Sequence, residues 1–188
     1  MKPSMKILAL LLGACQLLAL GCAEQPEMIN AMRVGQVERL AVLPFEDGPG
    51  MNGRQSGSAV TGLLTSELAR NGKYRVLERS KLKSVIDEQD LQRSGMVDQA
   101  TAVKMGKMLG VDAVILGSVT QYEMDKTQVY VHMIPIVSKD YTVGAAIRML
   151  DVENGEVIYA HSAFGKSPNS FNEAGKQAAQ RLLGPLPK

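Results

Sequence analysis

A glycine-rich stretch, GPGMNGRQSG at residues 48–57, is the part of the sequence with the clearest potential for chemistry. It follows an apolar run and precedes an amphipathic one, which is the strand–loop–helix context of a phosphate-binding loop. Gly48 and Gly53 have the spacing of that motif. However, Arg54 replaces the phosphate-binding lysine, and Gln55 replaces the hydroxyl residue that ligates magnesium. Arg54 leaves weak anion binding open, but we expect a surface loop at which a partner docks rather than a nucleotide-hydrolysing site.

Other reactive side chains are scarce. The two histidines, His132 and His161, fall in expected strands, where such residues most often belong to a sheet face. Two histidines without a thiolate partner make a poor zinc site, and no Gly-x-Ser-x-Gly nucleophile motif occurs. With five tyrosines, three phenylalanines and no tryptophan, the chain offers few stacking platforms for bases or sugars. The sequence therefore predicts no enzyme, no cofactor and no metal site.

The amino terminus has the pattern of a signal peptide. Two lysines precede an uncharged apolar run over residues 7–21, which would span about 22 Å as a helix and is too short to cross a bilayer core of about 30 Å. The run ends in LALGC, which resembles a bacterial lipobox. We therefore expect a lipoprotein signal peptide over residues 1–21 and lipid attachment at Cys22, with Cys15 in LLGAC as the alternative.

A lipidated cysteine would determine where the protein works. Two acyl chains give a stable membrane anchor, and residues 22–37 read as a lipidated tether without regular structure. Ala23 follows Cys22, whereas an aspartate there usually retains lipoproteins at the inner membrane, so we expect the periplasmic face of the outer membrane. Because the leader contains two of the 21 basic residues and none of the 19 acidic ones, the remainder carries no net charge. Nothing in that balance predicts a nucleic-acid partner.

From residue 38 onward the hydrophobic pattern is regular and predicts the order β-α-β-α-α-β-β-β-β-α. This order favours an α/β domain over residues 38–188, in which helices pack on a mixed, mostly antiparallel sheet. Asn154-Gly155 is a strong hairpin signal, whereas Pro135 places the later half of a separate strand over 127–138 at an edge or bulge. The expected helices begin at Ser58 and after Ser80, Asp98 and Ser170. Gly72 and Gly110 are expected to end the first and the third of them. The earlier strands are expected over 39–45, 74–78 and 112–119.

Three stretches together resemble the CsgG-like family: LAVLPFEDG at 40–48, the long segment 74–119, and IRMLDVENGEVIYA at 147–160. These are lipoproteins related to the curli secretion channel, with a core similar to the amino-terminal domain of TolB and to the peptidoglycan-synthase activator LpoB. The resemblance implies a TolB-N-like, CsgG-like core. It also implies a role in the cell envelope, with envelope proteins as partners.

The curli channel itself contributes two long membrane-spanning hairpins per subunit, each of which needs about 20 residues. Residues 124–140 leave room for one such hairpin, but GKSPNS at 165–170 leaves no room for a second. We therefore expect a membrane-anchored periplasmic lipoprotein that acts as a non-catalytic binding or assembly factor in envelope biogenesis. The alternative is a ring-forming homo-oligomeric component of a secretion or surface-organelle system, with residues 122–140 as its membrane-facing hairpin.

Overall fold

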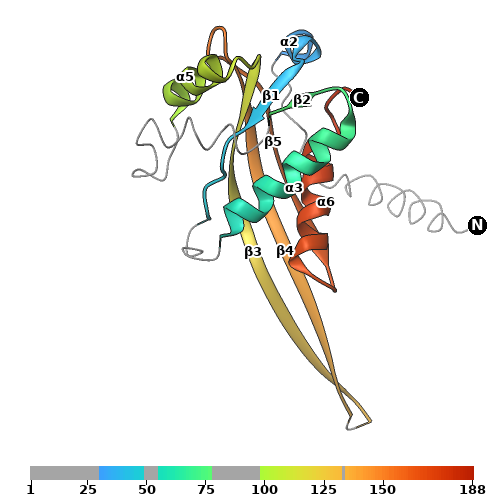
Figure 1. Ribbon diagram of the computed structural model, residues 1–188. Helices are drawn as coiled ribbons and strands as arrows, with labels where there is room; N and C mark the ends of the chain where they lie inside the picture. Colours follow the sequence, from blue (N-terminus) through green and yellow to red (C-terminus); the bar gives the residue numbers. More distant parts are fainter. Residues whose placement is uncertain (1–29, 49–54, 78–97, 133) are drawn as a thin grey trace, which may run out of the picture.

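The computed structural model describes residues 30–48, 55–77, 98–132 and 134–188 (Figure 1). Predictions for Cys15, Cys22, residues 49–54 and the helix after Ser80 lie outside these ranges and remain predictions. The elements are α2 (Ala31–Gln36), β1 (Arg39–Val42), α3 (Ser56–Asn71), β2 (Arg75–Val76), α5 (Gln99–Leu109), β3 (Ala113–Val131), β4 (Ile134–Asp151), β5 (Val157–Ser167) and α6 (Phe171–Leu183).

The five strands form one mixed sheet in the order β2-β1-β3-β4-β5. β1 lies parallel to both β2 and β3, whereas β3, β4 and β5 are antiparallel and supply the longest pairings. The predicted α/β fold, a mixed and mostly antiparallel sheet with helices packed on it, is confirmed. β3 occupies the centre, as its apolar residues on both faces require.

Helices cover both faces of the sheet. α3 and α6 lie side by side on one face (Figure 1), where Leu64 and Leu182 pack among inward residues of β3 and β4. α5 covers part of the other face, where Met105 packs with Val114 and Leu150. Alternate side chains of β3 and β4 therefore enter two separate cores, because successive strand residues point to opposite faces.

The predicted helix ends at Gly72 and Gly110, the caps at Asp98 and Ser170, and the predicted tight hairpin are confirmed. Gly72 and Gly110 follow α3 and α5 in the left-handed conformation, with φ of 81° and 64°. The side chains of Asp98 and Ser170 accept hydrogen bonds from backbone N–H groups of the first turns of α5 and α6. Gly155, with φ of 78°, lies in the turn that joins β4 to β5.

The separate strand predicted over 127–138 is wrong. The chain reverses at His132, and the two halves of this stretch pair with each other as the end of a long β3–β4 hairpin, with Tyr130 opposite Pro135. The turn escaped prediction because it contains neither glycine nor asparagine. Instead, His132 adopts a left-handed φ of 48°, which histidine tolerates better than most residues.

A second difference concerns the expected tether over residues 22–37. Its last part forms helix α2, whose Asn30 side chain accepts a hydrogen bond from the backbone N–H of Arg33. Val34 and Val37 are fully buried in the core on the α3 and α6 side. The folded domain therefore includes residues from Asn30 onward and does not begin at residue 38.

Candidate functional site

The far part of the β3–β4 hairpin is the most prominent surface feature of the domain. The last pairing of β4 with β5 joins Tyr141 to Ser167, so residues 124–140 pair only within the hairpin. Seven residues of β4 lie beyond that point, which at about 3.4 Å per residue gives a projection of about 24 Å. Figure 1 shows the hairpin extending well past α3 and α6.

Aromatic side chains brace the base of this projection. The ring of Phe171, at the start of α6, stacks on Tyr122 of β3 with 4.1 Å between centroids and an interplanar angle of 8°. Tyr141 of β4 meets the same ring edge-on at 4.9 Å. Because both strands contact one helix residue, the base of the hairpin is held against α6 and the projection starts from a fixed direction.

A β-bulge interrupts β3 just before Tyr122, on the side of the aromatic cluster away from the hairpin tip. The pairing shifts register between Val119 and Gln121, and a Cβ atom on Gly144 would lie only 2.7 Å from the Thr120 hydroxyl oxygen. A bulge adds one residue to one strand and reverses which alternate side chains of that strand face each side. As a result, the odd-numbered residues of β3 point toward α3 and α6 before the bulge, such as Ile115. Beyond the bulge the even-numbered residues point to that side, such as Tyr122.

The tip of the projection is apolar on both faces. Among the described residues, five large apolar side chains near the turn are at least half exposed: Val129, Tyr130, Ile134, Ile136 and Val137. Soluble monomers seldom leave a contiguous apolar patch of this kind uncovered, and such patches commonly mark contact surfaces. The sequence placed a hairpin in this region only as part of the ring-forming alternative.

A groove runs along the base of the hairpin between α3 and α6. It has a volume of about 470 Å³ and is lined by small residues of α3, including Gly62, together with Leu63, Tyr122 and Phe171. No Cβ contact restricts Gly62, because nothing lies within 4 Å of a Cβ atom built there. The groove therefore lies between helices α3 and α6 and the face of the hairpin base that carries Tyr122.

The described residues at the two ends of the glycine-rich stretch are bonded to each other at the start of α3. The Asp47 carboxylate accepts hydrogen bonds from the Ser56 hydroxyl and from the Gly57 backbone N–H, each at 2.6 Å. These bonds lower the pKa of Asp47. The helix N-terminus that would hold a phosphate in a nucleotide-binding loop is thus bonded to a carboxylate of the chain itself. Gly53 and Arg54 lie outside the described residues.

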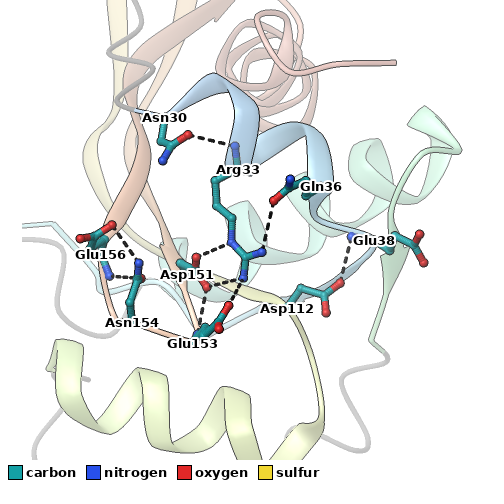
Figure 2. Close-up of polar contacts among 9 residues, drawn as sticks. All are labelled: Asn30, Arg33, Gln36, Glu38, Asp112, Asp151, Glu153, Asn154 and Glu156. Carbon is teal, nitrogen blue, oxygen red and sulfur yellow. Dashed lines mark hydrogen bonds and ion pairs between the residues drawn. The ribbon is translucent and has the colours of Figure 1, made fainter.

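At the end of the sheet away from the hairpin tip, a polar cluster attaches α2 to the β4–β5 turn (Figure 2). The Arg33 guanidinium bonds through Nε and Nη2 to the two carboxylate oxygens of Asp151, and Nη2 also lies 3.0 Å from Glu153. Asp151 is only 2% exposed. The hydrogen bond from Arg33 is the main cause that lowers the pKa of Asp151.

A second carboxylate supports the same end of the domain. Asp112 accepts hydrogen bonds from the backbone N–H groups of Glu38 and Arg39, at 3.0 and 2.8 Å. It thereby links the segment after α2 to the start of β3 (Figure 2). The sequence contains no local signal for either contact, because the partners are far apart along the chain. The geometry indicates a structural attachment of the amino-terminal segment.

The two histidines are not brought together with other ligands. His132 lies in the hairpin turn, not in the strand expected for it, and His161 lies in β5 with its ring 6.3 Å from that of Tyr159. Among residues 30–48, 55–77, 98–132 and 134–188, no group of three or more His, Cys, Asp or Glu could hold a metal ion. Within the same residues, no helix has the length and apolar character needed to cross a membrane.

These features describe an α/β domain with one projecting, apolar-tipped hairpin and a separately attached amino-terminal helix. Residues 37–184 match the family model described as "Curli production assembly/transport component CsgG". The chain belongs to that family, as the sequence resemblance implied. No curated protein matches the sequence.

Solved structures from several bacteria match the chain, and PelC supports the similarity of fold. The chain is 15% identical to PelC from Paraburkholderia phytofirmans, described as a dodecamer, with a TM-score of 0.57 over 86% of this chain and 93% of that one. It is 22% identical to lipoprotein GNA1162 from Neisseria meningitidis, with a TM-score of 0.46 over 78% and 93%. It is 18% identical to the LpoB C-terminal domain from Escherichia coli, with a TM-score of 0.46 over 66% and 79%.

Proposed function

We propose that this protein is a lipid-anchored, non-catalytic assembly component at the periplasmic face of the outer membrane, attached through Cys22. Its projecting β3–β4 hairpin is the surface through which it binds other envelope proteins. The observation that carries this proposal is the exposed apolar tip at Val129, Ile134 and Ile136, on a hairpin whose base is braced by Phe171. A braced projection with an uncovered apolar end suits protein contact better than catalysis.

Two further observations support the proposal. The chain belongs to the family of the curli assembly and transport component, which indicates secretion or assembly work. The N-terminus of α3 is bonded to Asp47, which weighs against a nucleotide at that loop. A ring-forming component of a secretion system is the second candidate, favoured by the apolar residues on both faces of the hairpin tip.

The anchor is tested by expressing the full chain in a Gram-negative host with radiolabelled palmitate. The wild type and Cys15→Ala are expected to carry label and to sediment with the outer membrane. Cys22→Ala is expected to lack the label. A labelled Cys22→Ala protein, or an unlabelled wild type in the cytosol, would contradict the proposed anchor.

The hairpin is tested by replacing residues 125–140 with Asn-Gly, a two-residue turn that the ends of β3 and β4 can accommodate. Because the removed residues pair only with each other, the shortened protein should remain lipidated and should melt within a few degrees of the wild type. With a photo-cross-linker at Glu123, an exposed position that both proteins retain, the wild type should form cross-links to other envelope proteins that the shortened protein does not form. Equal cross-linking by the two proteins would refute the assigned surface.

A further inference from the structure

We propose that a small pocket on the α5 face, the face of the sheet on which α5 packs, binds a free amino acid with a small side chain as its zwitterion. Glu46 binds the ammonium group of the ligand, and Arg148 binds its carboxylate. Ser118 lies on the strand between them and adds a hydroxyl group. The pocket shares no residue with the hairpin tip or with the groove beside α3, so the inference goes beyond the proposed function.

The pocket has a volume of about 150 Å³ and is lined by three neighbouring segments of the sheet. Glu46 comes from the segment after β1, which pairs in parallel with β3 at Ser118. Ser118 and Leu116 come from β3, and Arg148 comes from β4. The pocket therefore spans the width of β3, with Glu46 on one side of that strand and Arg148 on the other.

The strand register brings these side chains to one face. Ser118 lies directly opposite Ala146, and Leu116 lies directly opposite Arg148. Residues opposite each other share a face, and so do residues two apart on one strand. Leu116 belongs to the core on the α5 side, so Ser118, Arg148 and the bridged Glu46 also project to that side. α5 covers the next pair of residues on this face of β3 and β4, and the pocket lies just beyond that cover.

Neither charged side chain is paired within the part of the chain that the structure describes. Of the ion pairs found there, none includes Glu46 or Arg148. Their side chains also make no hydrogen bond to another described residue, and neither does the Ser118 hydroxyl. Glu46 is half-buried and Arg148 is exposed, so both can meet a ligand from solvent. A carboxylate and a guanidinium that line one pocket without pairing present two opposite charges to the same small molecule.

An amino acid zwitterion matches these groups. Its ammonium group donates hydrogen bonds to the Glu46 carboxylate, and its carboxylate accepts two parallel hydrogen bonds from the Arg148 guanidinium. The Ser118 hydroxyl can donate to the carboxylate or accept from the ammonium group. A simple anion or a simple cation fits less well, because each would meet a like charge at one side of the pocket.

The size of the pocket favours a free amino acid over a longer molecule. A volume of about 150 Å³ corresponds to about five water molecules in the liquid, so a nucleotide is too large for it. Neighbouring strands lie about 4.8 Å apart, which places the backbone of Glu46 about 10 Å from β4 across β3. The long side chains of Glu46 and Arg148 narrow that gap from both sides. Pro44 and Ala146 supply apolar surface for a small side chain.

The test is equilibrium dialysis of radiolabelled L-alanine against the full lipidated chain in detergent. The wild type should bind one alanine per chain saturably. Glu46→Gln and Arg148→Gln should each weaken binding at least about tenfold, because each removes a charge-assisted contact. Acetate and ethylammonium, which carry only one of the two charges, should compete at least about tenfold less well than unlabelled alanine.

Glu123→Gln and Lys139→Gln, at exposed positions of β3 and β4 outside the pocket, are the matched controls and should bind alanine as the wild type does. Circular dichroism melts should show that the Glu46 and Arg148 variants are folded, since these side chains have no described partner to lose.

Two results would overturn the site: no saturable binding at up to about 10 mM alanine, or equal binding by Arg148→Gln and the wild type. Tighter binding of L-alanyl-L-alanine than of alanine would assign the pocket to a peptide and overturn the free amino acid as its ligand. The palmitate and cross-linking tests of the proposed function do not depend on these results.

Discussion

The attachment of α2 offers a quantitative test of how the amino-terminal segment is held to the domain. Arg33→Ala removes both hydrogen bonds to Asp151 and the contact with Glu153. Hydrogen bonds to charged groups contribute about 1.5–3 kcal/mol, and an exposed pair adds less than about 1 kcal/mol. In this variant Asp151 stays buried and still accepts a hydrogen bond from the Glu153 backbone N–H, at 2.9 Å. The carboxylate is therefore not left without any hydrogen-bond partner. We expect a loss of about 2–4 kcal/mol.

For a domain of this size, that loss corresponds to a fall in Tm of roughly 4–16 °C. The assay is thermal and urea unfolding of the wild type, Arg33→Ala, Asp151→Ala and the double variant. The double-mutant cycle should give a coupling free energy of about 1–3 kcal/mol. Glu153→Ala is the matched control: its side chain is 80% exposed, and the change should stay within about 0.5 kcal/mol. Equal losses for Arg33→Ala and Glu153→Ala would refute the assignment.

The same pair predicts a pH dependence. Asp151 has its pKa lowered in the folded protein by the Arg33 hydrogen bond. A lowered folded-state pKa stabilises the protein above the unfolded value of about 3.9, and that stability is lost as pH falls through the folded value. The gap in stability between wild type and Arg33→Ala should therefore be full near neutral pH and should close below about pH 4. A gap as large at pH 2 as at pH 7 would contradict an ionic origin.

Three other changes test packing and capping by thermal unfolding. Gly165→Ala should destabilise by at least about 1–3 kcal/mol, because its Cβ would lie 2.0 Å from the Ala174 carbonyl oxygen. Gly62→Ala, in an open helical position, should instead stabilise by about 0.5–1 kcal/mol, and a loss there would contradict the open groove. Asp47→Ala should cost about 1–2 kcal/mol by uncapping α3, and a neutral result would show that the cap contributes nothing. Tyr159→Phe should cost about 1–3 kcal/mol, since its hydroxyl donates a buried hydrogen bond, and an unchanged Tm would refute that contribution.

Local sequence signals predicted much of the fold. Asp98 and Ser170 cap helices, Gly72 and Gly110 end them, and Asn154-Gly155 marks a tight hairpin, because each acts through neighbours within a few residues. The apolar runs likewise predicted the mixed sheet and its strands, except for the separate strand over 127–138. These features need no knowledge of the tertiary structure.

Features that depend on distant partners could not be read in this way. α2 is a short helix stabilised by Arg33 and Asp151, which are 118 residues apart, so its segment resembled a tether. The long hairpin was predicted as a single separate strand because the turn at His132 lacks glycine and asparagine and lies within a mostly apolar run over 129–137. The position of Asp125 directly opposite Asp140 becomes visible only once the cross-strand register is known.

The central claim is that this chain works as an assembly component through its projecting hairpin. The most direct measurement is quantitative mass spectrometry of the envelope proteins that co-purify with the lipidated full-length protein in detergent, beside the variant in which Asn-Gly replaces residues 125–140. The wild type is expected to retain envelope proteins that the folded, shortened protein loses. The same set of proteins in equal amounts with both would contradict the claim.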